Sequence, residues 1–202
     1  MRAWSLRRFI FGLLVFGVAC GPIRAWAQPP GPQSAYFPIE QLTPTRVEKL
    51  LAAPNVVLLT DYYRIDMRFG PNLRIDAVIV ADANDARTRV KGLRVQVRDP
   101  ENRRRQDGTS YIDHDELVRL VRGLTTMAEL AEKWTHDDRQ ATELTFTTTG
   151  GFRLAIRQSA RIPRAYLSTG LFDPVVTSMD LVELPTLKQA FEQALTILNS
   201  KQ

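Results

Sequence analysis

The sequence predicts a two-layer α+β domain, in which helices lie on one face of antiparallel β-strands. Residues 63–79 and 144–156 carry apolar side chains on alternate positions, which is the pattern of half-buried strands. Residues 117–134 and 187–198 instead space them three and four positions apart, as helices with one buried side do. From the way these segments follow one another, we predict the order α-βββ-α-ββ(β)-α.

The first 27 residues have the three parts of a secretory signal peptide. Arginines near the start precede an apolar run, 9–19, which is too short for a bilayer-spanning helix of roughly 20 residues. Alanines on both sides of Trp26 suit a cleavage site. We therefore predict that residues 1–27 are a signal peptide and that the mature chain begins at Gln28, exported to the periplasm or the cell exterior. The alternative is an uncleaved anchor or a buried helix.

Cys20 allows another interpretation of this segment. Residues 17–20 (Gly-Val-Ala-Cys) resemble the lipobox of bacterial lipoproteins, although glycine stands where that pattern usually has leucine. The alternative localisation is thus a lipoprotein anchored at Cys20. A small hydrophobic cysteine inside a signal sequence explains the residue equally well.

Removing the leader changes the charge of the chain. The full sequence has 27 Lys+Arg and 22 Asp+Glu, and four of the arginines but none of the acids lie in residues 1–27, so 23 − 22 leaves +1. We therefore expect no nucleic-acid partner. The mature chain also lacks cysteine, so it relies on a hydrophobic core rather than on disulfides.

The domain is predicted to follow a short lead-in. Residues 28–42 are rich in Pro and Gln, and residues 43–202 form a single α+β domain. A short helix is expected first, with Thr43 as its N-cap, Pro44 at its first position and Pro54 at its end.

Three strands are predicted next. Alternation defines strands 63–69 and 73–79, and charge selects their register. The tightest hairpin sets like charges opposite each other, whereas a slide by two residues pairs Arg64 with Asp76 and keeps every side chain on its face. The third strand runs over 90–97 with its apolar side chains inward.

A polar loop, 98–110, is predicted before the long helix. Asp113 and Glu116 have the spacing of a capping box, and helical periodicity continues to Trp134. Because Gly123 lies inside this run, the segment is either one helix or two helices divided there.

The second half is predicted to contain a hairpin, further strands and a final helix. A three-residue loop, 149–151, with a left-handed glycine keeps the apolar residues of 144–148 and 152–156 on one face. One or two strands follow, over 165–169 and 175–179. The last helix begins near Asp180 or at Pro185.

The sequence contains no nucleophile elbow, phosphate loop or dinucleotide fingerprint. His114 and His136 stand beside acidic residues, but adjacent helical residues point in different directions, so these acids suit helix ends better than a metal site. Carboxylate pairs such as Asp61 and Asp66 could serve a glycosidase, but the sequence does not give the distance between the two carboxylates that this chemistry requires. We therefore predict no catalytic residue, no metal site and no cofactor.

The distribution of charge is the remaining functional clue. Residues 55–112 hold eleven Lys/Arg against eight acids, whereas residues 113–140 hold four against seven. If helices cover one face of the strands, the other face presents arginines to an anionic glycan, a lipid headgroup or an acidic protein. The alternative is a solvated face whose arginines pair with Asp66 and Asp76. The candidate binding residues are Arg64, Arg68, Arg74, Arg94 and Arg98, with Arg153 and Arg157 outward on the second hairpin.

Four short motifs, 92–93, 111–113, 142–143 and 150–152, resemble those of small exported bacterial proteins of uncharacterised function. The resemblance covers roughly residues 55–200 and implies no active site. We expect an exported, non-enzymatic binding or structural domain of the bacterial cell envelope. A small envelope hydrolase is the alternative, and it requires a deep pocket in which histidine or carboxylates converge.

Overall fold

The structure is a computed structural model that describes residues 43–65, 72–85, 87–99, 107–134, 141–159, 162–170 and 173–201. The predicted signal peptide, Cys20 and the lead-in lie outside the described residues, as do Asp66, Arg68 and His136. Within the described ranges, no helix is long and apolar enough to cross a membrane.

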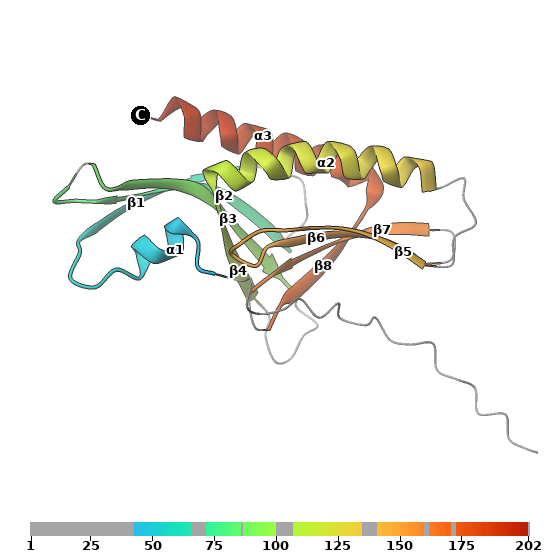
Figure 1. Cartoon of the computed structure of the whole chain (residues 1–202), viewed down its shortest axis with the longest axis horizontal. Coiled ribbons are helices and arrows are strands. Elements are labelled where there is room, and N and C mark those ends of the chain that lie inside the picture. The colour runs from blue at the N-terminus through green and yellow to red at the C-terminus, as the bar shows by residue number, and fades with distance from the viewer. Residues whose placement is uncertain are drawn as a thin grey trace, which may run out of the picture. The chain divides into compact units, whose positions relative to one another are not determined.

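The predicted α+β class is confirmed. Over the described residues, the chain forms two four-stranded antiparallel sheets and three α-helices in the order α-ββββ-α-ββββ-α (Figure 1). The elements are α1 (Arg46–Leu51), β1 (Leu58–Arg64), β2 (Leu73–Asp82), β3 (Arg89–Arg98), β4 (Asp107–Asp113), α2 (His114–Trp134), β5 (Ala141–Thr147), β6 (Arg153–Ser159), β7 (Ile162–Thr169), β8 (Val175–Asp180), the 3₁₀ turn η2 (Leu181–Glu183) and α3 (Leu184–Ser200).

Each sheet is a meander in which neighbours in sequence are neighbours in space. The first sheet has the order β1-β2-β3-β4 and the second the order β5-β6-β7-β8. Helices α2 and α3 lie side by side over one face of the sheets, and α1 lies on the opposite side of the first sheet (Figure 1). We call the side toward α2 and α3 the inner face and the opposite side the outer face.

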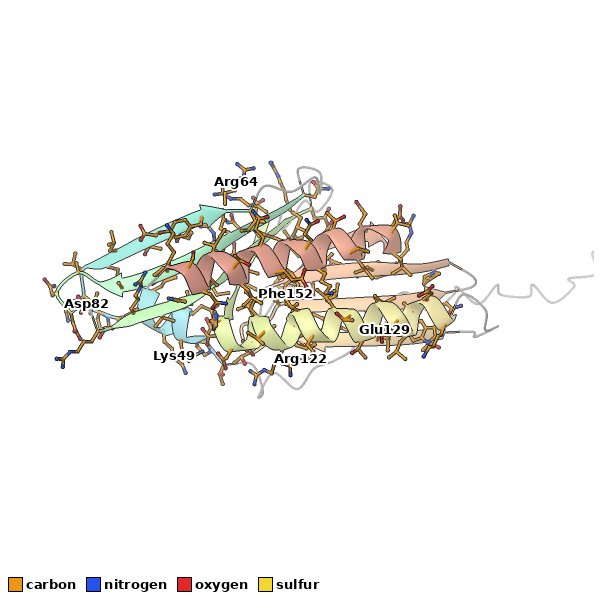
Figure 2. All side chains as sticks on the ribbon, turned by 90° about the horizontal axis from the view of Figure 1, so that it is seen from above. Lys49, Arg64, Asp82, Arg122, Glu129 and Phe152 are labelled. Atoms are coloured by element: carbon orange, nitrogen blue, oxygen red, sulfur yellow. The ribbon has the colours of Figure 1, made fainter. Side chains whose placement is uncertain are left out.

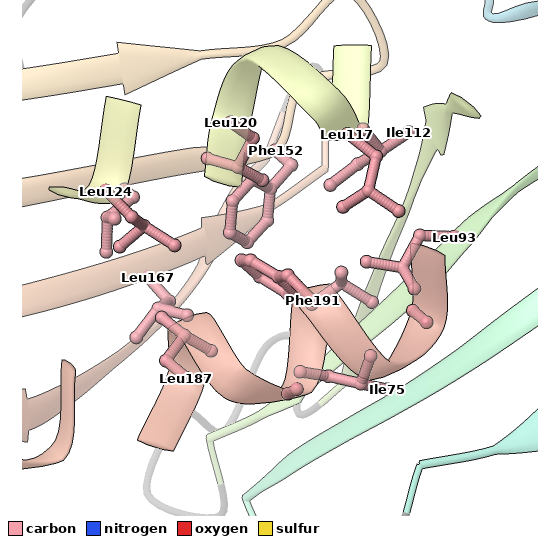
Figure 3. Close-up of a cluster of buried hydrophobic side chains, with 14 of the residues drawn as sticks. Ile75, Leu93, Ile112, Leu117, Leu120, Leu124, Phe152, Leu167, Leu187 and Phe191 are labelled. Atoms are coloured by element: carbon pink, nitrogen blue, oxygen red, sulfur yellow. The ribbon is translucent and has the colours of Figure 1, made fainter. Parts of the chain in front are cut away.

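One hydrophobic core joins both sheets to the two long helices. At its centre Phe152 and Phe191 meet edge to face, with ring centroids 6.1 Å apart (Figure 3). Leu117 and Leu120 from α2 and Leu187 from α3 are also fully buried there. The helical and strand periodicities of the sequence therefore converge on one interior, as predicted.

Both predicted hairpin registers are confirmed. Arg64 pairs with Asp76 between β1 and β2, which is the register that charge selected. Leu144 pairs with Ile156 between β5 and β6, and Gly151 in the connecting loop has a φ of 75°. Strand β1 begins at Leu58, five residues earlier than the alternation indicated.

The N-cap of α1 was predicted two residues too early. Thr45, not Thr43, is the cap: its hydroxyl accepts a hydrogen bond from the Glu48 N–H, and Glu48 in turn binds the Thr45 N–H at 2.8 Å. This reciprocal capping box outweighs the preference of Pro44 for a first helical position. The helix ends at Leu51, before Pro54.

The predicted polar loop 98–110 was wrong at its end, because residues 107–110 belong to β4. This strand lacks an apolar alternation since its inner face meets the second sheet closely. Gly108 lies against Thr169 and Val175, and the buried Ser110 hydroxyl accepts a hydrogen bond from the Gly170 N–H at 3.0 Å. Small and polar residues fit this junction, so the strand resembles a loop in sequence.

Asp113 and Glu116 do not form the predicted capping box at the start of α2. The Asp113 carboxylate accepts hydrogen bonds from the N–H groups of Arg46 at 2.9 Å and Val47 at 3.3 Å, at the first turn of α1. Glu116 accepts the Thr149 N–H at 2.9 Å. Both carboxylates therefore connect elements that are distant in sequence, which a local motif does not indicate.

Helix α2 is continuous through Gly123, which settles the choice between one helix and two. A Cβ atom at this position would lie 2.9 Å from the Phe146 ring. The glycine therefore allows β5 to approach the helix and does not end it.

Candidate anion-binding face

Helix α1 divides the outer face of the first sheet into two regions. Val47 packs on Val78 and Val80 and buries one end of the sheet in a second, small apolar cluster. The other end carries polar and aromatic side chains from β1 to β4. We call this region the arginine face, and its residues are Tyr62, Arg64, Arg74, Asp76, Arg94, Gln96, Arg98, Thr109 and Tyr111.

Asp76 is the centre of the arginine face. Its side chain is fully buried, and it accepts hydrogen bonds from Arg74 Nε at 3.0 Å and from Arg94 NH2 at 2.9 Å. Arg64 lies directly opposite Asp76 on β1, and Arg94 lies opposite it on β3. A single carboxylate thus lies among several arginines, so the net charge of this face is positive.

The two arginines bound to Asp76 differ in exposure. The Arg94 side chain is 16% exposed, and its guanidinium carbon lies 3.9 Å from the centre of the Tyr62 ring. The Arg74 side chain is 47% exposed. Among the described residues, the hydrogen bonds of Arg74 run from its Nε–H alone to the two Asp76 oxygens. Because a guanidinium has five N–H donors, the terminal N–H groups of this half-exposed side chain have no hydrogen-bond partner among the described residues.

Tyr62 and Tyr111 complete the face, and the sequence analysis missed both. Burial raises the pKa of Tyr111, and the neighbouring Tyr62 hydroxyl raises it further, while Arg94 opposes the shift. The two phenols and Arg94 therefore interact as one group. The sequence did contain a signal for Tyr62. It lies two residues before Arg64, and residues two apart on a strand point to the same face.

The other predicted binding residues are less closely integrated. Arg98 is exposed and lies 3.8 Å from Asp107, which is also exposed, a pair of the kind that contributes little to stability. Arg68 lies outside the described residues. The structure thus brings Arg64, Arg74 and Arg94 together around Asp76, with Arg98 further along β3.

The outer face of the second sheet also has arginines, but a carboxylate binds them more completely. Glu143 forms ion pairs with Arg153 and with Arg157, whose Nε lies 2.5 Å from it. Burial raises the pKa of Glu143, but hydrogen bonds from Thr145 and Arg157 and the charges of Arg157 and Arg153 lower it below its usual value overall. Both arginines are mostly buried, so they offer little accessible positive charge. Arg164, next to Arg157 on β7, is 55% exposed and lies 3.9 Å from Asp180.

His114 forms a contact between the two long helices, α2 and α3. Its Nε2 lies 2.9 Å from Oδ1 of Asn199 on α3, at the surface. Among the described residues, no group of three or more His, Cys, Asp or Glu side chains is arranged to hold a metal ion.

No family model matches this chain, and neither a curated protein nor a solved structure matches it.

Proposed function

We propose that the protein is a non-enzymatic binding domain of the bacterial cell envelope, exported by its N-terminal leader, which recognises an anionic polysaccharide through the arginine face. The observation that carries the proposal is the Arg74–Asp76–Arg94 cluster. A buried carboxylate binds two guanidiniums, and one of these, on the half-exposed Arg74, makes no described hydrogen bond through its terminal N–H groups. A planar guanidinium of this kind matches sulfate and carboxylate groups in two-point hydrogen bonds.

Preorganisation supports a binding role for this cluster. A flexible arginine loses side-chain entropy when a ligand fixes it, and Asp76 reduces this cost in advance. Tyr62 adds a partly exposed ring beside the charged groups, so the face offers both apolar and cationic contact. A sheet face suits an extended polymer, because its side chains recur at regular strand spacing.

The hydrolase alternative gains no support from His114. Its described partner is the Asn199 amide at the surface, and not a serine or an aspartate in a pocket. General acid–base catalysis requires a proton-transfer group positioned at the substrate, and this contact holds the ring between two helices instead.

The proposal is tested by titrating the protein with dextran sulfate and, as the matched neutral ligand, with dextran of the same length. We expect binding to dextran sulfate that weakens as salt is added, because salt screens charges at the surface. Arg74→Gln is expected to weaken it roughly tenfold, the effect of losing one charge-assisted hydrogen bond of about 1.4 kcal/mol.

Arg119→Gln is the matched control for this titration. Arg119 is also exposed and also ion-paired, with Asp115 at 3.6 Å, but it lies on α2. The substitution removes the same charge but from α2, on the side of the sheets away from the arginine face. We therefore expect little change in the affinity for dextran sulfate. Equal weakening by the two substitutions, or equal binding of dextran, contradicts the proposal. Binding to vesicles of anionic lipid or to a poly-glutamate peptide, without binding to dextran sulfate, would reassign the partner class.

A further inference from the structure

Strand β1 is the open edge of the first sheet. It pairs with β2 on one side, and no described strand pairs with its other side. At the opposite edge, the backbone of β4 at Tyr111 lies against Gly150 in the β5–β6 loop. Val57, Leu59 and Tyr62, three of the large apolar side chains exposed in the described part of the chain, lie on or beside β1, at 64%, 58% and 42% exposure. An apolar edge of this kind is a template for pairing with another strand.

The hydrogen bonds of β1 show which of its backbone groups face the open edge. Ile65 N–H binds Ile75 O at 3.0 Å, and Ala83 N–H binds Val57 O at 2.8 Å. Since hydrogen-bonded pairs alternate along an antiparallel ladder, the odd-numbered residues of β1 bind β2. The N–H and C=O groups of Leu58, Thr60, Tyr62 and Arg64 therefore point away from the sheet.

We propose that this edge binds the β1 strand of a second copy of the chain, in antiparallel orientation, to form a continuous eight-stranded sheet. A two-fold axis then relates the copies, as in most homodimers. The inference does not require the proposed ligand, although Tyr62 and Arg64 belong both to this edge and to the arginine face.

Charge selects the register of this pairing. The backbone groups that point outward belong to even-numbered residues, so an axis at position 60, 61 or 62 lets the two strands pair along most of their length. An axis at Asp61 sets the two Asp61 carboxylates opposite each other, which is unfavourable. An axis at Thr60 sets Asp61 opposite Leu59. An axis at Tyr62 sets Asp61 opposite Tyr63 and Thr60 opposite Arg64.

Lys201 favours the register centred on Tyr62, because it provides an opposite charge for Asp61. Its Nζ lies 5.0 Å from the centre of the Tyr63 ring, on the inner face that Asp61 also occupies. In the register centred on Tyr62, Asp61 of each copy comes next to Lys201 of the other, and the contact occurs twice. Leu59, exposed in the single chain, then lies opposite Ile65. This register therefore brings Asp61 to Lys201 and sets the two Tyr62 residues opposite each other.

Disulfide cross-linking of single-cysteine variants tests the pairing and its register. In the full chain carrying Cys20→Ser, the introduced cysteine is the only thiol. Tyr62→Cys is expected to form a covalent dimer under mild oxidation, because residues paired across the axis have Cα atoms about 5.5 Å apart, within disulfide range. Asp61→Cys is the matched control and is expected not to link, since its counterpart lies opposite Tyr63.

Charge exchange provides the second test, measured as the dimer dissociation constant by sedimentation velocity. Asp61→Lys is expected to weaken the dimer roughly fivefold, because it sets like charges together at two symmetric positions. Adding Lys201→Glu to it restores the attraction and the dimer. Circular dichroism verifies that each variant is folded.

Three results overturn this inference. One is a monomer at all concentrations, which includes the case where residues 28–42 of the same chain cover the edge. Another is efficient cross-linking of Asp61→Cys without that of Tyr62→Cys. The last is a failure of Lys201→Glu to rescue Asp61→Lys.

Discussion

Asp76→Asn is expected to destabilise the fold by about 2 kcal/mol and, at the same time, to strengthen binding to dextran sulfate. The substitution keeps the shape of the buried side chain but removes the charge that Arg74 and Arg94 share. The loss of stability is measured by urea unfolding. The gain in binding follows because the face keeps its arginines and loses its central negative charge.

Asp107→Asn is the matched control for this result. It removes a carboxylate that also pairs with an arginine, at 3.8 Å, but that is 74% exposed. We expect its free energy of unfolding to change by less than about 0.5 kcal/mol. If Asp76→Asn is as stable as the native protein, Asp76 is not the anchor of the face. If it loses stability and affinity together, the cluster supports the fold without serving the ligand.

Phe152→Ala is expected to have the larger effect on stability, a loss of about 4 kcal/mol in the free energy of unfolding. The ring is fully buried and packs edge to face on Phe191, where the second sheet meets α3 (Figure 3). Truncation removes its burial, leaves a cavity and loses the aromatic pair. Urea unfolding followed by circular dichroism gives the value.

Val182→Ala provides the comparison, because Val182 is 83% exposed in η2. Its substitution is expected to change stability by less than about 0.5 kcal/mol. A loss below about 1 kcal/mol for Phe152→Ala would show that the two sheets and the helices do not share one core.

Much of the fold could be predicted because its signals are local. Alternation defined β2, β3 and β6, helical spacing defined α2 and α3, and the Arg64–Asp76 pair defined a register that β1 and β2 adopt. These features depend on which side of an element faces the core. The spacing of apolar residues a few positions apart in the sequence determines that side.

The errors arose where distant elements meet. Strand β4 was missed because Gly108 and Ser110 fit against the second sheet, and Asp113 was assigned to its own helix when its carboxylate binds the start of α1. Neither partner is near in sequence. The same limit applies to the candidate site. The outward arginines were visible in the sequence, but the complete burial of Asp76 and the stacking of Arg94 on Tyr62 require the folded sheet.

The arrangement of charged groups also shows how the helices and the outer face differ. Figure 2 looks onto α2 and α3, where Arg122 and Glu129 mark the mixed charges along the exposed side of α2. Arg64, at the end of β1, belongs to the row around Asp76 instead. A polyanion that recognises this domain is therefore expected to distinguish the two sides.

Nuclear magnetic resonance of the arginine Nε–H groups during titration with dextran sulfate measures this distinction most directly. The proposed function predicts that the Arg74 and Arg94 signals shift with saturable dependence on ligand, while those of Arg119 and Arg122 on α2 remain unchanged. Shifts of equal size on both sides of the domain, or shifts confined to α2, would contradict a binding site on the arginine face.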